Sequence, residues 1–325
     1  MRKFLLLLLS LCFVFSLFTG CSSSDQPKKD KDKKPSTQTG QNPSDKNNEK
    51  DELNNIVRFS EGLEFTKMPN GAYRVTGMGT CTDTDVVIPD TYNGASVIGI
   101  DNKVFMNNAS ITSVVIPDGV LAIDNSSFDD CASLKKVVIP ASVIEIGNAA
   151  FYGCTALETV TIPEGVKSLG KWVFDRCKSL TSISIPASVT SIGVSVFRGC
   201  DSLTEITVDS GNSVYHSAGN CLIETASGAL ITGCKTSVIP TDGSVTRIEK
   251  NAFESCSGLT NITIPASVNY IGSDAFMSCS SLESVVFENP NGWVVDYIKV
   301  NVSSPETAKN YLRGKYSEFV WTREG

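Results

Sequence analysis

Three consecutive stretches of equal length decide the fold. They read LKKVVIPASVIEIGNAAFYGCTA (134–156), LETVTIPEGVKSLGKWVFDRCKS (157–179) and LTSISIPASVTSIGVSVFRGCDS (180–202). Each stretch has 23 residues and places Leu, Pro, Gly, Phe and Cys at the same positions. A fixed period of this length is typical of a solenoid, in which every repeat forms one coil.

Each repeat predicts a strand, a corner, a second short strand and a tight turn. Residues 137–139 are β-branched and precede Pro140, which has no N–H group and therefore ends the hydrogen-bonded ladder. Residues 143–146 form a second extended piece, and Gly147 is expected to permit the corner that follows. Apolar residues then recur at every third position over 151–157, which suits a helical or 3₁₀ turn.

Stacking is needed because one coil has no partner against which to bury its apolar side. Like residues then lie over like, so the phenylalanines at 105, 128, 151, 174 and 197 should form a buried column. The predicted fold class is a leucine-rich-repeat type of solenoid. It is a β-rich right-handed superhelix of 23-residue coils with a parallel sheet, short 3₁₀ or helical turns, one hairpin insertion and end caps.

The period is interrupted once and is lost at both ends. Leu203 and Leu259 are separated by 56 residues, which is one repeat and 33 additional residues. The additional segment contains two apolar runs around Ala226-Ser227-Gly228, so we expect a hairpin that projects from the stack edge. The predicted divisions are an N-terminal β cap at 53–80, the solenoid at 81–288 with its insertion at about 209–237, and a C-terminal cap at 289–325.

The N-terminal segment predicts export. Residues 1–20 combine Arg2 and Lys3 with an apolar run too short to span a membrane comfortably, which is typical of a signal peptide. The sequence Leu-Phe-Thr-Gly-Cys at 17–21 resembles the bacterial lipobox, which implies cleavage before Cys21 and lipidation of that residue. The alternative is an ordinary signal peptide with a chance cysteine. Residues 21–52 then form a disordered, lipidated tether, because 22–52 contain no aliphatic or aromatic side chain.

The charge balance argues against nucleic acid as a partner. The net charge of −7 becomes −9 once Arg2 and Lys3 are removed with the signal peptide. A protein that binds nucleic acid needs a basic surface to neutralise phosphates.

The repeat Leu-x-x-Val-x-Ile-Pro-x-Ser-Val-x-x-Ile-Gly-x-x-Ala-Phe-x-x-Cys resembles the Treponema pallidum-type leucine-rich repeat of BspA-like bacterial surface proteins. The resemblance implies an exported, surface-exposed lipoprotein, and some members of the family are implicated in adhesion. We therefore expect an adhesin that contacts host matrix or other cell-surface proteins, anchored to the membrane through Cys21. The alternative is a lipoprotein that captures glycans or peptides for nutrient uptake.

Reactive side chains give no chemical constellation. The cysteines at 131, 154, 177 and 200 would form a line, whereas zinc needs a tetrahedron of ligands, so they are interpreted as buried filler. A disulfide between Cys221 and Cys234 stays open. His216 is the single histidine, which excludes motifs with two histidine ligands. We expect no enzyme, no metal and no cofactor, and a monomer.

The remaining candidates are the outward-facing strand positions. In the Leu-x-x-Val-x-Ile strand, the residues between the apolar positions point away from the core, and their small, mildly polar side chains suit a broad contact with a macromolecule. The predicted binding residues are Lys136, Val138, Thr159, Thr161, Ser182, Ser184, Glu205 and Thr207.

Overall fold

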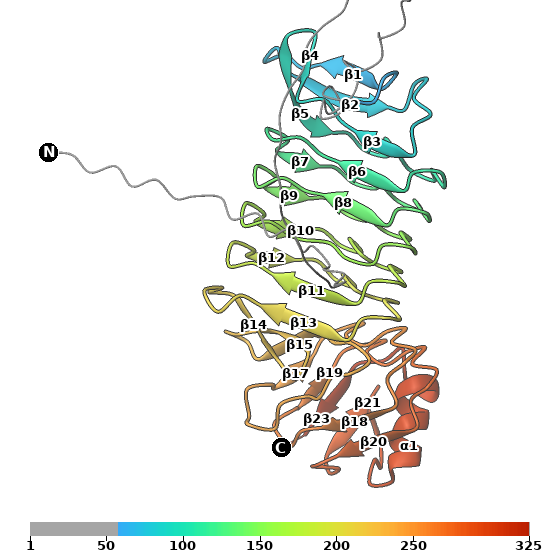
Figure 1. Ribbon diagram of the computed structural model, residues 1–325. Helices are drawn as coiled ribbons and strands as arrows, with labels where there is room; N and C mark the ends of the chain where they lie inside the picture. Colours follow the sequence, from blue (N-terminus) through green and yellow to red (C-terminus); the bar gives the residue numbers. More distant parts are fainter. Residues whose placement is uncertain (1–57, 325) are drawn as a thin grey trace, which may run out of the picture. The chain divides into compact units, whose positions relative to one another are not determined.

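The computed structural model describes residues 58–324. The predicted signal peptide, the tether and Cys21 lie outside these residues. Residues 57–325 form one compact unit, whose strands are stacked coil upon coil (Figure 1). No helix in the described segment is both long and apolar enough to cross a membrane.

The N-terminal end begins with an antiparallel hairpin of β1 (Glu64–Lys67) and β2 (Tyr73–Gly77). β2 pairs in parallel with β5 (Ala95–Ile100), and the short β4 (Thr91–Tyr92) pairs antiparallel with β5. The hairpin thereby occupies the edge that the first coil would otherwise leave open.

Parallel strands continue along the stack on two faces. On one face, β5 is followed by β7 (Ala122–Ile123), β9 (Glu145–Ile146), β10 (Ser168–Leu169) and β12 (Ser191–Ile192). The other face, which we call the strand face, carries β3 (Asp85–Val87), β6 (Ser113–Val115) and β8 (Lys136–Val138), then β11 (Ser182–Ile185) and β13 (Glu205–Val208). Paired residues of regular neighbouring coils differ by 23, as in Glu145 with Ser168, so the sequence period is the ladder register.

The predicted phenylalanine column is confirmed. The rings at 105, 128, 151, 174 and 197 lie nearly parallel, with centroid distances that increase from 4.9 to 5.9 Å along the stack. Phe128, Phe151 and Phe174 are fully buried. These distances match the spacing of neighbouring strands, so each ring packs on the ring of the next coil.

The turns that carry the phenylalanines are single turns, and none in residues 58–324 is a 3₁₀ helix. Bonds from residue i to i−3 do occur, for example from the N–H of Cys154 to the carbonyl of Phe151. The intervening N–H groups instead donate to the next coil, as Phe151 does to Val173. Because alternate donors are used between coils, a continuous 3₁₀ helix has no bonds left to form.

Gly147 is needed for a reason that differs from the predicted one. Its φ is not in the left-handed region, whereas that of Ala149 is, at 54°. A Cβ on Gly147 would lie 2.7 Å from the backbone nitrogen of Asn125 in the preceding coil. Glycine therefore allows two coils to approach closely, and the corner itself is made two residues later.

The prediction that the inserted hairpin projects from the stack is wrong. β14 (Tyr215–Ala218), β15 (Cys221–Glu224) and β16 (Ala229–Thr232) form an antiparallel meander, and β16 pairs in parallel with β17 (Arg247–Ile248). The meander thus takes the place of a coil inside the stack. Its residues explain this, because Cys221, Leu222 and Ile223 are consecutive, apolar and fully buried, which requires protein on both faces.

The meander separates two hydrophobic cores. Leu222 belongs to the core of the preceding coils, whereas Cys221 and Ile223 belong to the core of the following ones. Successive side chains of a strand point to opposite faces, so β15 acts as a wall between the two cores.

The coils beyond the meander repeat the same scheme. β17 pairs with β19 (Tyr270–Ile271), and on the strand face β18 (Asn261–Ile264) pairs with β20 (Ser284–Phe287). β23 (Trp321–Arg323) then pairs antiparallel with β19 and with β21 (Trp293–Val295), which carries β22 (Ile298–Lys299) at the edge.

A short helix ends the strand face. α1 (Pro305–Asn310) packs against β20 and is followed by a π-helical turn, Tyr311–Lys315. Ser304 caps α1 by accepting a hydrogen bond from the N–H of Thr307. Together with the tryptophans of β21 and β23, α1 closes the second core.

The nine cysteines of the described segment are free thiols, including Cys221 and Cys234. In the regular coils each Sγ donates to the phenylalanine carbonyl of the preceding coil, as Cys154 does to Phe128 at 3.2 Å. Burial raises the pKa of the Cys131 and Cys279 thiols to about 12. These thiols are protonated, inert filler at neutral pH.

Candidate functional site

The predicted binding residues lie on the strand face. All eight are exposed except Ser182, which is half-buried, and they alternate with buried residues such as Val137 and Ile183. The alternation follows from the pleat of a strand that packs one side on the core.

The ladder brings some of these residues together. Ser182 pairs with Glu205 and Ser184 with Thr207, so four of the predicted residues form one patch on β11 and β13. Lys136 and Val138 lie on β8, where Val138 is 42% exposed beside Val115 at 38%. At the N-terminal end of the same face, hydroxyl groups of Ser113 and Thr112 lower the pKa of Asp85.

Thr159 and Thr161 occupy an interruption in the sheet. Residues 159–162 form no strand, and within the described chain no backbone hydrogen bond joins them to β8 or β11. The one backbone bond near this segment runs from the N–H of Thr181 to the carbonyl of Glu158, at 3.3 Å. The same coil remains laddered elsewhere through β10, so the opening is confined to the strand face.

A shallow hollow of about 350 Å³ lies at this interruption. Four of the predicted residues line it, namely Thr159, Thr161, Ser182 and Ser184. The inward-facing Val160 and Ile162 also reach its surface, because the ladder is open there. The hollow presents hydroxyl and peptide groups, which can donate or accept hydrogen bonds.

The sequence reasoning missed Glu164 and Asp209, whose side chains complete the lining. Both stand where the repeat changes. Glu164 lies in Pro-Glu-Gly instead of the common Pro-Ala-Ser, and Asp209 replaces the proline that ends the other strands. The N–H of Asp209 consequently continues the ladder to the carbonyl of Ile185, and its Oδ1 accepts from Gly211. Departures from the repeat were the signal that could have identified them.

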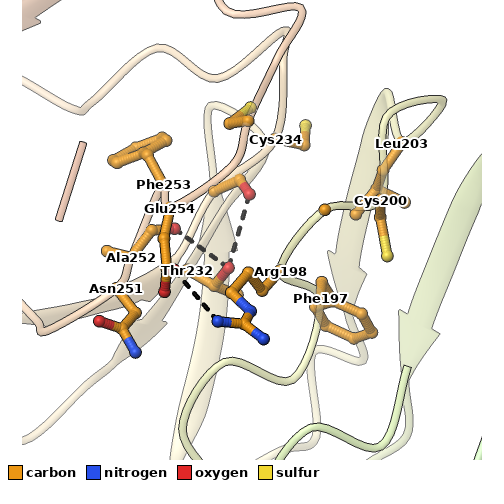
Figure 2. A pocket seen from close by; sticks show the side chains of 13 residues that line it. Phe197, Arg198, Cys200, Leu203, Thr232, Cys234, Asn251, Ala252, Phe253 and Glu254 are labelled. Atoms are coloured by element: carbon orange, nitrogen blue, oxygen red, sulfur yellow. Dashed lines mark hydrogen bonds and ion pairs between the residues drawn. The ribbon is translucent and has the colours of Figure 1, made fainter. Parts of the chain in front are cut away.

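A second cavity lies where the regular coils meet the meander, and it is structural. Figure 2 shows Arg198 reaching Glu254, and Thr232 bonded to the backbone oxygens of Gly233 and Ala252. The enclosed space of about 10 Å³ has room for about one water molecule. It therefore offers no ligand site.

Arg198 links the two sides of this junction. It contacts Asp175 at 2.6 Å and Glu254 at 3.1 Å, and the Asp175 side chain is completely buried. Burial raises the pKa of Asp175, and the guanidinium of Arg198 opposes that shift. The residues described contain no cluster of three or more side chains that could hold a metal ion.

Several solved structures are similar to the chain. A leucine-rich cell surface protein from Faecalibacterium prausnitzii shares 30% identity over 71% of this chain and 76% of its own length, with a TM-score of 0.44. The pneumococcal vaccine antigen PcpA shares 19% identity over 70% of this chain and 69% of its own length, with a TM-score of 0.56. The T. pallidum leucine-rich repeat protein shares 22% over 68% and 88%, with a TM-score of 0.48. PcpA supports the fold alone.

No match was found among curated proteins. The family model for the BspA type leucine rich repeat region matches residues 98–222 and 220–297, in six copies. These matches cover more than half of the chain, and the F. prausnitzii protein is related at the level of sequence. The chain therefore belongs to the BspA-type leucine-rich repeat family of bacterial surface proteins.

Proposed function

We propose that the protein is a lipid-anchored adhesin of the bacterial surface, without enzymatic activity, that holds another surface protein against its strand face. The observation that carries the proposal is the exposed patch formed by Ser182, Ser184, Glu205 and Thr207 on β11 and β13. A flat row of this kind makes many weak contacts with a broad partner, as protein interfaces do.

The anchor is part of the proposal. Cys21 would carry the lipid, and residues 22–52 would separate the folded domain from the membrane. A flexible segment of 31 residues spans roughly 30 Å on average, which is enough to clear the lipid head groups.

Glycan capture is the second candidate, and one residue favours it. Trp172 is 40% exposed on the turn side of the stack and has a φ of +58°, a conformation that is rare for a bulky side chain. Its N–H donates to the carbonyl of Val194, which is 46% exposed. An exposed indole can stack on a sugar ring, but it lies away from the strand face.

The test is adhesion of cells that display the full chain to immobilised matrix proteins and to a glycan array. Ser184→Tyr adds bulk in the middle of the strand face and should reduce protein adhesion about tenfold, which corresponds to ~1.4 kcal/mol. Thr190→Tyr is the matched control, because Thr190 is exposed beside β12 on the other face. Adhesion that both variants retain equally, or glycan binding that is lost with Trp172→Ala, would reject the strand-face adhesin.

A further inference from the structure

We propose that the hollow at residues 159–162 receives an arginine or lysine side chain of the partner protein. This inference rests on the proposed adhesin function and names the chemistry that the strand face recognises. Three features support it: the open ladder, the acceptors that line the hollow, and its charge.

The open ladder leaves peptide groups available in the middle of a sheet. Backbone groups that face protein are nearly always paired, and an unpaired one is costly unless water or a ligand reaches it. Here the carbonyls of residues 159–162 have no backbone partner in the described structure. They lie beside the hollow that Val160 and Ile162 help to line.

The lining supplies acceptors in addition to these carbonyls. The hydroxyls of Thr159, Thr161, Ser182 and Ser184 surround the hollow, and the carboxylates of Glu164 and Asp209 complete its lining. A guanidinium or ammonium group is a donor only, so a site made of acceptors suits it. Charge-assisted hydrogen bonds of this kind are roughly twice as strong as neutral ones.

The charge of this part of the strand face is complementary to a cation. Glu158 and Glu205 flank the hollow on the neighbouring strand positions, in addition to Glu164 and Asp209. No basic residue lines the hollow, and Lys136 lies on the preceding coil. An acidic surface attracts a basic partner and repels an acidic one.

Size and composition distinguish the occupant. A volume of about 350 Å³ exceeds that of a single ion and accommodates a long side chain. No aromatic ring lines the hollow, so it lacks a surface on which a sugar could stack. An arginine or lysine on an exposed loop of a protein fits both observations.

The experiment uses the full chain purified from membranes in detergent and three peptides, acetyl-Gly-Gly-X-Gly-Gly-amide, in which X is Arg, Gln or Glu. Backbone amide shifts are followed by NMR during each titration. The Arg peptide should shift the amides of 159–162, 182 and 184, and the Gln and Glu peptides should not. Raising the salt concentration should weaken the interaction, because exposed charges are screened.

The variant Glu164→Gln/Asp209→Asn should weaken binding of the Arg peptide about tenfold, which corresponds to a tenfold rise in Kd. The amide introduced at position 209 keeps the side-chain oxygen that accepts from the N–H of Gly211. The control Glu61→Gln/Glu145→Gln removes two exposed carboxylates outside the strand face and should leave the Kd unchanged.

The outcomes separate this inference from the proposed function. If cells adhere to a protein partner but the Arg peptide shifts none of these amides, the adhesin stands and the cation site is rejected. If the Arg and Gln peptides act alike, or a disaccharide shifts the same amides, the site is also rejected. If the Arg peptide binds as expected and cells adhere to no protein, the adhesin fails and the cation site remains.

Discussion

At the scale of single residues, stability comes from side chains that repeat along the stack. Phe151 has Phe128 on one side at 5.2 Å and Phe174 on the other at 5.6 Å. Its ring is therefore shared between three coils, and removing it affects the packing of its neighbours as well as its own. The same logic applies to the thiols, whose carbonyl acceptors come from the preceding coil.

We predict that Phe151→Ala lowers the free energy of unfolding by about 3–5 kcal/mol, because it removes buried area and leaves a cavity that rigid neighbours cannot close. Denaturant unfolding followed by circular dichroism measures the change. Phe319→Ala is the control, since Phe319 is 40% exposed and should cost much less. Equal midpoints for the two variants would contradict a buried column.

At the scale of elements, the meander interrupts both the ladder and the ring column. Phe253 stacks on Phe276 at 5.1 Å, but its other side faces Gly233 of the meander, where a Cβ would lie 2.1 Å from the ring. Polar side chains then join the two sets of coils on the turn side. Asn251 donates to the hydroxyl of Ser195 at 2.8 Å, and Arg198 bridges Asp175 and Glu254.

We predict that Arg198→Ala destabilises the protein by about 3–5 kcal/mol, because it leaves the fully buried Asp175 carboxylate without its cation. Arg176→Ala is the matched control, since Arg176 is exposed and has no ion pair in the described structure. The double variant Arg198→Ala/Asp175→Asn should recover part of the loss. Thermal unfolding that is unchanged by Arg198→Ala would show that the junction does not depend on this contact.

At the scale of the whole domain, the stack is nearly one-dimensional, because each coil contacts mainly its two neighbours. Every regular coil has 23 residues and the same register, so one coil can substitute for another. The irregular parts are the terminal hairpin, the meander and the C-terminal elements, which close the cores.

We predict that deletion of 151–173, one complete period, yields a shorter stack that still unfolds cooperatively. The deletion joins Ala150 to Phe174, which preserves every column. Deletion of 151–170 removes almost the same mass but shifts all later residues by three positions, so it should prevent folding of the coils that follow. Circular dichroism and thermal melts distinguish the two products. Similar behaviour of both deletions would mean that register does not determine the fold.

The regular coils could be predicted from the sequence because several residue types keep one period, and the phenylalanine column follows directly from it. The path of the hairpin could not, since local turn signals at 226–228 do not reveal which elements cover Cys221 and Ile223. The exposed positions of the strand face followed from alternation. The hollow did not, because the coil that opens there, 157–179, has the same pattern as its laddered neighbours.

The wall formed by β15 has a mechanical consequence. A stack whose coils are joined only to their neighbours can be peeled from an end, and one lost coil exposes the next. At β15, however, Leu222 is anchored in one core and Ile223 in the other, within antiparallel pairing on both sides. When force pulls on the N-terminal end, unravelling should pause there, so that a chain dragged by flow keeps its distal part intact and can rewind from it.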